Sequence, residues 1–149
     1  MSRIRITKRF TFEMAHALSG YDGLCRNIHG HSYILWVTIA GEPVSDKKSP
    51  KDGMLLDYSD LSSIIKDKII SGLDHCLLLK RDMADATDTF RKDLCSRLVY
   101  VDYQPTCENL LADLAKRIRL LLPSTVNLHS LKLQETENSY AEWFSEDNK

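Results

Sequence analysis

Residues 25–31, CRNIHGH, place a cysteine and two histidines, all of which bind soft or borderline metals, within seven positions. His29 and His31 are two apart at the start of a predicted strand, so both imidazoles should lie on one face. A third histidine, His16, ends the preceding predicted strand, where a turn can bring it beside the pair. Three neutral imidazoles would bind Zn²⁺ and leave one position free for water or substrate, as in a catalytic site.

Cys25 leaves two interpretations of this stretch open. The thiol could be a fourth ligand that closes the metal site. Alternatively, it could lie beside the metal, where a nearby cation favours the thiolate and allows it to act as a general base or nucleophile. Cys107, at the first turn of a predicted helix, is a competing thiol, although a small first-turn residue is the simpler interpretation. The histidines could also be separate residues without a shared ligand.

Two further features have the residue types of an active site. Asp74 directly precedes His75 after a predicted helix, where a carboxylate can orient an imidazole and raise its basicity. An ordinary helix-terminal loop would explain this pair equally well. Glu135 lies in the last predicted strand, where it either faces solvent or accepts hydrogen bonds from a ligand with paired N–H donors.

Strands must position these residues. Period-two patterning predicts a long strand over residues 3–15, and β-branched and aromatic residues predict a second over 31–41. After a polar loop, residues 53–58, GMLLDY, predict a third strand that returns as a hairpin. Residues 98–103 form a short predicted strand, 127–136 form the last one, and the tail from 141 is expected to be poorly ordered.

Two amphipathic helices are expected to cover the sheet. In the first, an apolar stripe runs from Leu61 to Ile69, with Ser59 as a candidate cap and Gly72 at the end. In the second, Thr106 is the predicted N-cap, and Pro123 ends a stripe that includes Leu121. A short extra helix is predicted over residues 83–98. This order favours an α+β layer with both main helices on one face of an antiparallel sheet.

Length, charge and hydropathy argue against several classes of protein. The 149 residues fit one domain, 1–149, which needs neither a disulfide nor a metal merely to fold. Twenty Lys and Arg against 21 Asp and Glu give a net charge of −1, so the composition lacks the excess of basic residues that is typical of nucleic-acid-binding proteins. The amino terminus lacks the apolar core of a signal peptide, and no segment approaches the roughly 18 apolar residues of a membrane span. We expect a cytoplasmic protein with reduced cysteines.

Several stretches also resemble one known family. They occur in the same order as in the 6-pyruvoyl tetrahydropterin synthase family: His16, CxxxHGH at 25–31, GMLLDYSDL at 53–61, LDH at 73–75, PTCEN at 105–109 and QETENS at 134–139. The resemblance covers nearly the whole chain. The three residues between Cys25 and HGH resemble the queuosine-biosynthesis branch, since pyruvoyl-forming enzymes typically have a longer interval and a folate-related branch has glutamate in place of the cysteine. The segment 80–103 is longer than in the shortest members.

The resemblance implies a role for each candidate residue. The zinc ligands would be His16, His29 and His31, here called the histidine triad. Cys25 would accept a proton, and Asp74 with His75, here called the relay pair, would relay protons. Glu135 would hold the pterin, with Thr106 and Glu108 near the substrate.

The resemblance also implies a fold, an assembly and a reaction. The fold would be the tunnelling fold, an antiparallel four-stranded sheet with two main helices on one face. The assembly would be a homo-oligomer, a hexamer built as a dimer of trimers, with sites between subunits. The reaction would convert 7,8-dihydroneopterin triphosphate to 6-carboxy-5,6,7,8-tetrahydropterin, acetaldehyde and triphosphate. The alternatives are a 6-pyruvoyl tetrahydropterin synthase, which omits the carbon–carbon cleavage, and a noncatalytic zinc-binding module.

Overall fold

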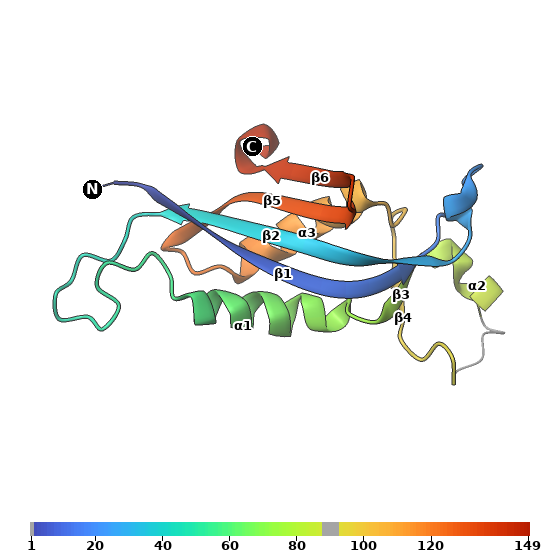
Figure 1. Cartoon of the computed structure of the whole chain (residues 1–149), viewed down its shortest axis with the longest axis horizontal. Helices are drawn as coiled ribbons and strands as arrows, with labels where there is room; N and C mark the ends of the chain where they lie inside the picture. Colours follow the sequence, from blue (N-terminus) through green and yellow to red (C-terminus); the bar gives the residue numbers. More distant parts are fainter. Residues whose placement is uncertain (1, 88–92) are drawn as a thin grey trace.

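The structure, a computed structural model, describes residues 2–87 and 93–149 and is built on one twisted sheet (Figure 1). The sheet has six strands in the order β4-β3-β1-β2-β5-β6. Its antiparallel part consists of β1 (Ile4–His16), β2 (His29–Gly41), β5 (Val126–Thr136) and β6 (Ser139–Phe144). Two short strands, β3 (Cys76–Lys80) and β4 (Leu98–Val101), add in parallel at the end of β1. The prediction of a four-stranded, wholly antiparallel sheet is therefore wrong.

Two differences from the predicted strands account for the mixed, six-stranded sheet. Residues 53–57 form the end of a turn and a bend instead of a third strand, with Gly53 at a φ of +81°. The segment Cys76–Lys80 is a strand instead, and four of its five residues are buried. A buried parallel strand shows no alternation of polar and apolar residues, so periodicity does not reveal it. The tail is also ordered, because residues 139–144 pair with β5 as an edge strand.

The long hairpin of β1 and β2 forms the centre of the sheet. The two strands pair without interruption from Ile4 opposite Gly41 to His16 opposite His29. Phe10, Phe12 and Met14 alternate into the core from β1, while Tyr33 and Leu35 begin the buried row of β2. This register brings the two histidine-bearing ends together at the end of the hairpin.

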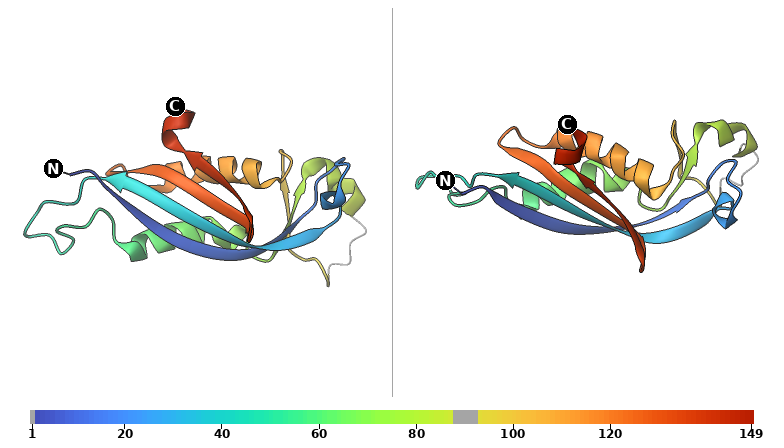
Figure 2. Two further views of the ribbon diagram at one scale, coloured as in Figure 1. Left: turned by 45° about the horizontal axis from the view of Figure 1, so that its top comes forward. Right: turned by 90° about the horizontal axis from the view of Figure 1, so that it is seen from above.

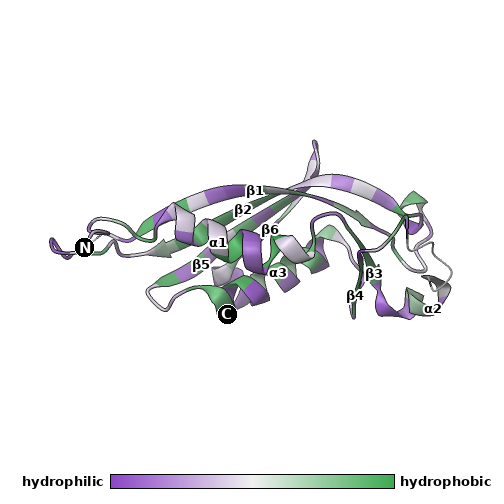
Figure 3. Ribbon diagram, turned by 90° about the horizontal axis from the view of Figure 1, so that it is seen from below, coloured by the Kyte–Doolittle hydropathy of each residue, from purple (hydrophilic) through white to green (hydrophobic). Residues whose placement is uncertain are grey.

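Helices α1 (Tyr58–Lys68) and α3 (Cys107–Leu121) lie on the same face of the sheet (Figure 2). Both show apolar and polar bands along their length, as expected for helices with one buried side (Figure 3). The predicted cap of α3 is confirmed, since the Thr106 side chain accepts a hydrogen bond from the Asn109 N–H. The cap of α1 is Asp57, not Ser59, and Leu121 is 38% exposed, so it lies outside the buried stripe.

Short elements complete the chain. The 3₁₀ turns are Leu24–Arg26, Ile70–Gly72, Arg81–Met83 and Ser145–Asn148. Of the extra helix predicted over 83–98, the structure contains α2 (Ala84–Thr87), while residues 88–92 lie outside the described residues. The predicted strand after it is confirmed as β4. Within the described ranges, no helix is long and apolar enough to cross a membrane.

Candidate metal centre and active site

The histidine triad gathers where β1 ends and β2 begins. One ring nitrogen from each histidine lies within 4.8 Å of the others. The pairing of His16 with His29 across the hairpin brings these two together, and His31 follows two residues later on the same face of β2. The hypothesis that the three histidines form one cluster is therefore confirmed in geometry.

The hydrogen bonds of the rings show that the cluster suits a cation. His16 Nδ1 lies 2.7 Å from the Pro105 carbonyl oxygen, and His29 Nδ1 lies 2.7 Å from the Asn27 carbonyl oxygen. Both Nδ1 atoms must donate to these carbonyls, so in the neutral rings each Nε2 carries a lone pair. These two Nε2 atoms are only 3.1 Å apart. Two facing lone pairs repel unless a cation lies between them, and a carbonyl on the second nitrogen is typical of metal-binding histidines.

Burial also favours the neutral imidazoles that a metal requires. His16 is 3% exposed, and this burial lowers its pKa, although its bond to the Pro105 carbonyl acts in the opposite direction. Burial likewise lowers the pKa of His31, against the attraction of Glu135. Metal binding then competes with fewer protons at neutral pH.

Glu135 lies beside the triad instead of facing solvent. Its Oε1 atom is 3.5 Å from His16 Nε2 and 3.7 Å from His31 Nε2. The same oxygen accepts a hydrogen bond of 3.0 Å from the Tyr33 hydroxyl. No motif in the sequence marks Tyr33, yet its position two residues after His31 places it on the same strand face.

Cys25 lies in the loop between β1 and β2, on an exposed 3₁₀ turn. It is not a member of the metal-binding group, so in the described part of the chain the closed site with Cys25 as ligand does not form. A second missed residue, Gln104, anchors this loop. Its side chain accepts from the Ser19 N–H at 3.2 Å and donates to the Ser19 carbonyl at 2.7 Å, and the Leu18 N–H donates to the Cys25 carbonyl.

The relay pair forms the expected contact, with His75 Nδ1 3.0 Å from Asp74 Oδ1. Asp74 also accepts the Glu13 N–H at 2.9 Å, and this bond, followed by that of His75, lowers the pKa of its carboxyl group. His75 has a φ of 60°, the one positive value at a non-glycine residue among those described. Such strain is typical of functional positions.

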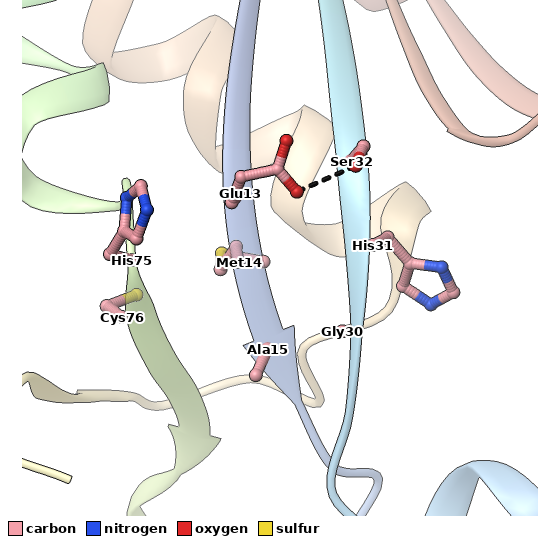
Figure 4. A pocket seen from close by; sticks show the side chains of 8 residues that line it. All are labelled: Glu13, Met14, Ala15, Gly30, His31, Ser32, His75 and Cys76. Atoms are coloured by element: carbon pink, nitrogen blue, oxygen red, sulfur yellow. Dashed lines mark hydrogen bonds between the residues drawn. The ribbon is translucent and has the colours of Figure 1, made fainter. Parts of the chain in front are cut away.

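His75 of the relay pair lies across β1 from His31 of the triad. A cavity of about 350 Å³ is lined by residues that include His31 and His75. Figure 4 shows the His31 ring pointing away from β1, while His75 lies on the other side of that strand. Across the described residues, no hydrogen bond or ion pair joins the relay pair to Cys25 or to the triad. The structure therefore does not assemble all predicted catalytic residues within one copy of the chain.

The loop before α3 approaches the triad through its backbone. Pro105 supplies the carbonyl for His16, so the next residue, Thr106, lies at the edge of the site as the helix cap. Glu108 is exposed in the first turn of α3. Cys107 is buried, which raises the pKa of its thiol to about 12, and its Sγ lies 3.5 Å from the Leu133 carbonyl. Cys107 therefore stays a neutral thiol and is not the competing base.

The fold and the site define an α+β protein whose sheet carries a histidine cluster suited to a metal, with a carboxylate beside it. Residues 5–146 match the family described as 6-pyruvoyl tetrahydropterin synthase. The chain belongs to this enzyme family.

Named relatives and solved structures agree with this membership. The 6-carboxy-5,6,7,8-tetrahydropterin synthase of Haemophilus influenzae is 33% identical over 141 residues, which cover 93% of this chain and 97% of that protein. The Rickettsia typhi protein of the same name is 30% identical, with 93% and 99% covered. An uncharacterized protein from Wolinella succinogenes superimposes with a TM-score of 0.73 at 20% identity, covering 97% and 99% of the two chains. Caenorhabditis elegans 6-pyruvoyl tetrahydropterin synthase superimposes with a TM-score of 0.68 at 19% sequence identity, and the match covers 97% of each chain. At these identities the two structures support the fold alone.

Proposed function

We propose that this protein is a zinc-dependent 6-carboxy-5,6,7,8-tetrahydropterin synthase of queuosine biosynthesis. It would convert 7,8-dihydroneopterin triphosphate and one water to 6-carboxytetrahydropterin, acetaldehyde and triphosphate. The family match and the two named relatives support this assignment. The observation that carries it is the convergence of the triad nitrogens with the Glu135 carboxylate, because this combination can bind a metal and a pterin side by side.

The residues of the chain would divide the chemistry between them. Zinc bound to the triad would polarise the side-chain oxygens of the substrate and so acidify the adjacent C–H bonds. Cys25 would remove a carbon-bound proton as a thiolate. Glu135 would accept two hydrogen bonds from the amino-pyrimidine edge and fix the ring, with Thr106 and Glu108 bordering the same pocket. Because Asp74 accepts from His75, it would hold that imidazole in one orientation for proton relay.

A second copy of the chain would complete the site. Within one copy His75 lies across β1 from His31 (Figure 4). β3 pairs only with residues 14–16 of β1, and the relay pair bonds the backbone of Glu13, so among the described residues the edge of β1 before Glu13 is free to pair with another copy, as is the outer edge of β6. We propose a homo-oligomer, by resemblance a hexamer, working in the cytoplasm, where the four unpaired cysteines stay reduced.

Mixing inactive subunits tests this assembly. Cys25→Ala and His75→Ala proteins should each be inactive, yet regain activity when they are unfolded together and refolded, since some sites then receive both intact residues. Refolding each variant alone is the control. A mixture that remains as inactive as its components would show that each site is built within one chain.

The reaction itself is tested by product analysis. Purified protein loaded with zinc and supplied with 7,8-dihydroneopterin triphosphate should release acetaldehyde, and mass spectrometry should detect the carboxylated pterin. A pyruvoyl product without acetaldehyde would instead identify a 6-pyruvoyl tetrahydropterin synthase. Zinc binding without any turnover would favour the noncatalytic module.

A further inference from the structure

Tyr33 is the residue on which this inference rests, and the core holds it rigidly. It is 0% exposed. Its ring stacks on Phe12, with centroids 5.2 Å apart and planes 10° from parallel. The ring meets His31 edge-on, with centroids 5.5 Å apart. The ring edge borders the triad and the hydroxyl reaches Glu135, so stacking on Phe12 sets the position of the hydroxyl.

The Tyr33 hydroxyl binds an oxygen that a metal would also attract. It donates to Glu135 Oε1 over 3.0 Å. The same oxygen lies 3.5 Å from His16 Nε2 and 3.7 Å from His31 Nε2, the atoms that would face the metal.

Glu135 therefore has two possible partners. A carboxylate oxygen bonds zinc at about 2.0–2.2 Å, and three histidines plus one carboxylate would fill a tetrahedral site. Such a closed site would leave no position for substrate oxygens, and the carboxylate would no longer be available to a pterin. A hydroxyl that the core holds in place restrains Oε1 through its hydrogen bond and so opposes a shift of the carboxylate toward the metal.

We propose that Tyr33 is a positioning residue that keeps Glu135 from becoming the fourth metal ligand, so that the metal stays open and the carboxylate stays free for substrate. This inference rests on the proposed function, because it assumes a metal at the triad. Core packing alone does not require the Tyr33 hydroxyl. The proposal gives this hydroxyl the role of keeping the metal open to substrate.

Cobalt(II) and azide test the proposal without the reaction. Co²⁺ replaces zinc and gives visible absorption bands that report its coordination, and azide binds only at an open position. Tyr33→Phe keeps the ring and the stacking but removes the hydroxyl. We expect this variant to take up Co²⁺ and to bind azide at least about tenfold more weakly than the wild type, the scale at which outer-shell partners act on metal sites. Adding Glu135→Gln to Tyr33→Phe should restore azide binding, because the blocking carboxylate is gone.

The chain offers a matched control in Tyr103. This second, partly buried tyrosine donates to Asp113 over 3.1 Å, and Asp113 is not part of the triad. Tyr103→Phe should leave azide binding unchanged. Thermal unfolding of each variant checks that the fold is intact, and the Glu135→Gln single variant gives the azide affinity of a site without the carboxylate.

The outcomes separate this proposal from the proposed function. Equal azide affinity in the wild type and Tyr33→Phe would overturn the role of Tyr33 and leave the function standing. The expected azide result without acetaldehyde formation would refute the reaction and leave the role of Tyr33 standing. A wild-type protein that takes up no Co²⁺ would overturn both.

Discussion

His16 and His29 face each other across the hairpin with their Nε2 atoms 3.1 Å apart, while each Nδ1 is bound to a backbone carbonyl. Neither ring can rotate to relieve the contact without losing its carbonyl partner. The backbone therefore fixes the two Nε2 atoms where they can share one cation.

Removing one imidazole should remove the metal. His29→Ala leaves two histidines of the triad, so we expect zinc affinity to fall by more than about 100-fold, the upper range for losing a residue that only hydrogen-bonds to a ligand. Metal analysis after equilibration with a competing chelator measures the loss. His129→Ala is the control, because His129 packs against Phe144 and is outside the triad. Equal zinc content in both variants would contradict the triad.

The metal-free protein should lose stability as the solution becomes acidic. Burial lowers the pKa of His16 and His31 in the folded protein below the ordinary value of 6.5. As the pH falls below 6.5, the unfolded chain binds protons first, so the free energy of unfolding decreases. Above pH 6.5 both histidines are neutral in the folded and the unfolded protein, so protonation no longer reduces the free energy of unfolding. Urea unfolding at pH 7.5 and pH 5.0 measures it in chelator-treated protein.

A variant isolates the contribution of His16 to this pH dependence. His16→Gln has no imidazole at the buried position, so its free energy of unfolding should change less between the two pH values than that of the wild type. Identical changes in both proteins would show that other groups cause the effect.

The cysteines should differ in reactivity. Burial raises the pKa of Cys76 to about 11 and that of Cys107 to about 12, so neither forms appreciable thiolate at pH 7.5. Cys25 is exposed. Brief treatment with iodoacetamide should therefore alkylate Cys25 much faster than Cys76 or Cys107, as peptide mass spectrometry can measure. Faster labelling of Cys107 would contradict the structure.

Alkylation should also affect function selectively. Modified protein, or Cys25→Ala, should keep its zinc and its thermal stability but lose turnover, because Cys25 lies outside the triad that would bind the metal. Cys95→Ala serves as a control for loss of a thiol elsewhere. Loss of zinc from Cys25→Ala would restore the interpretation of the thiol as a fourth ligand.

The backbone strain at His75 should separate stability from function. At its φ of 60° a side chain with a Cβ is disfavoured by about 1–2 kcal/mol, whereas glycine is not. His75→Gly should therefore have a free energy of unfolding about 1 kcal/mol above that of His75→Ala, while both lose turnover. Urea unfolding and acetaldehyde release provide the measurements. A glycine variant less stable than the alanine variant would show that the strain is compensated elsewhere.

The sequence by itself determined the local features of this protein. The period-two pattern predicted β1, and β-branched and aromatic residues predicted β2. The spacing of His29 and His31 placed both rings on one face because side-chain direction repeats every two residues along a strand. The stripes of α1 and α3 and the Thr106 cap also follow from short-range geometry. The ordered motifs supplied the family, which the match over residues 5–146 confirms.

Only the tertiary structure decided the relationships between distant segments. The strand at Cys76–Lys80 has no alternation because both of its faces are covered, so its place beside β1 depends on the whole fold. The bond from Tyr33 to Glu135 joins residues 102 positions apart, and the carbonyl of Pro105 reaches His16 across 89. Contacts of this kind leave no pattern in the local sequence, because they arise when strands and loops pack into one sheet.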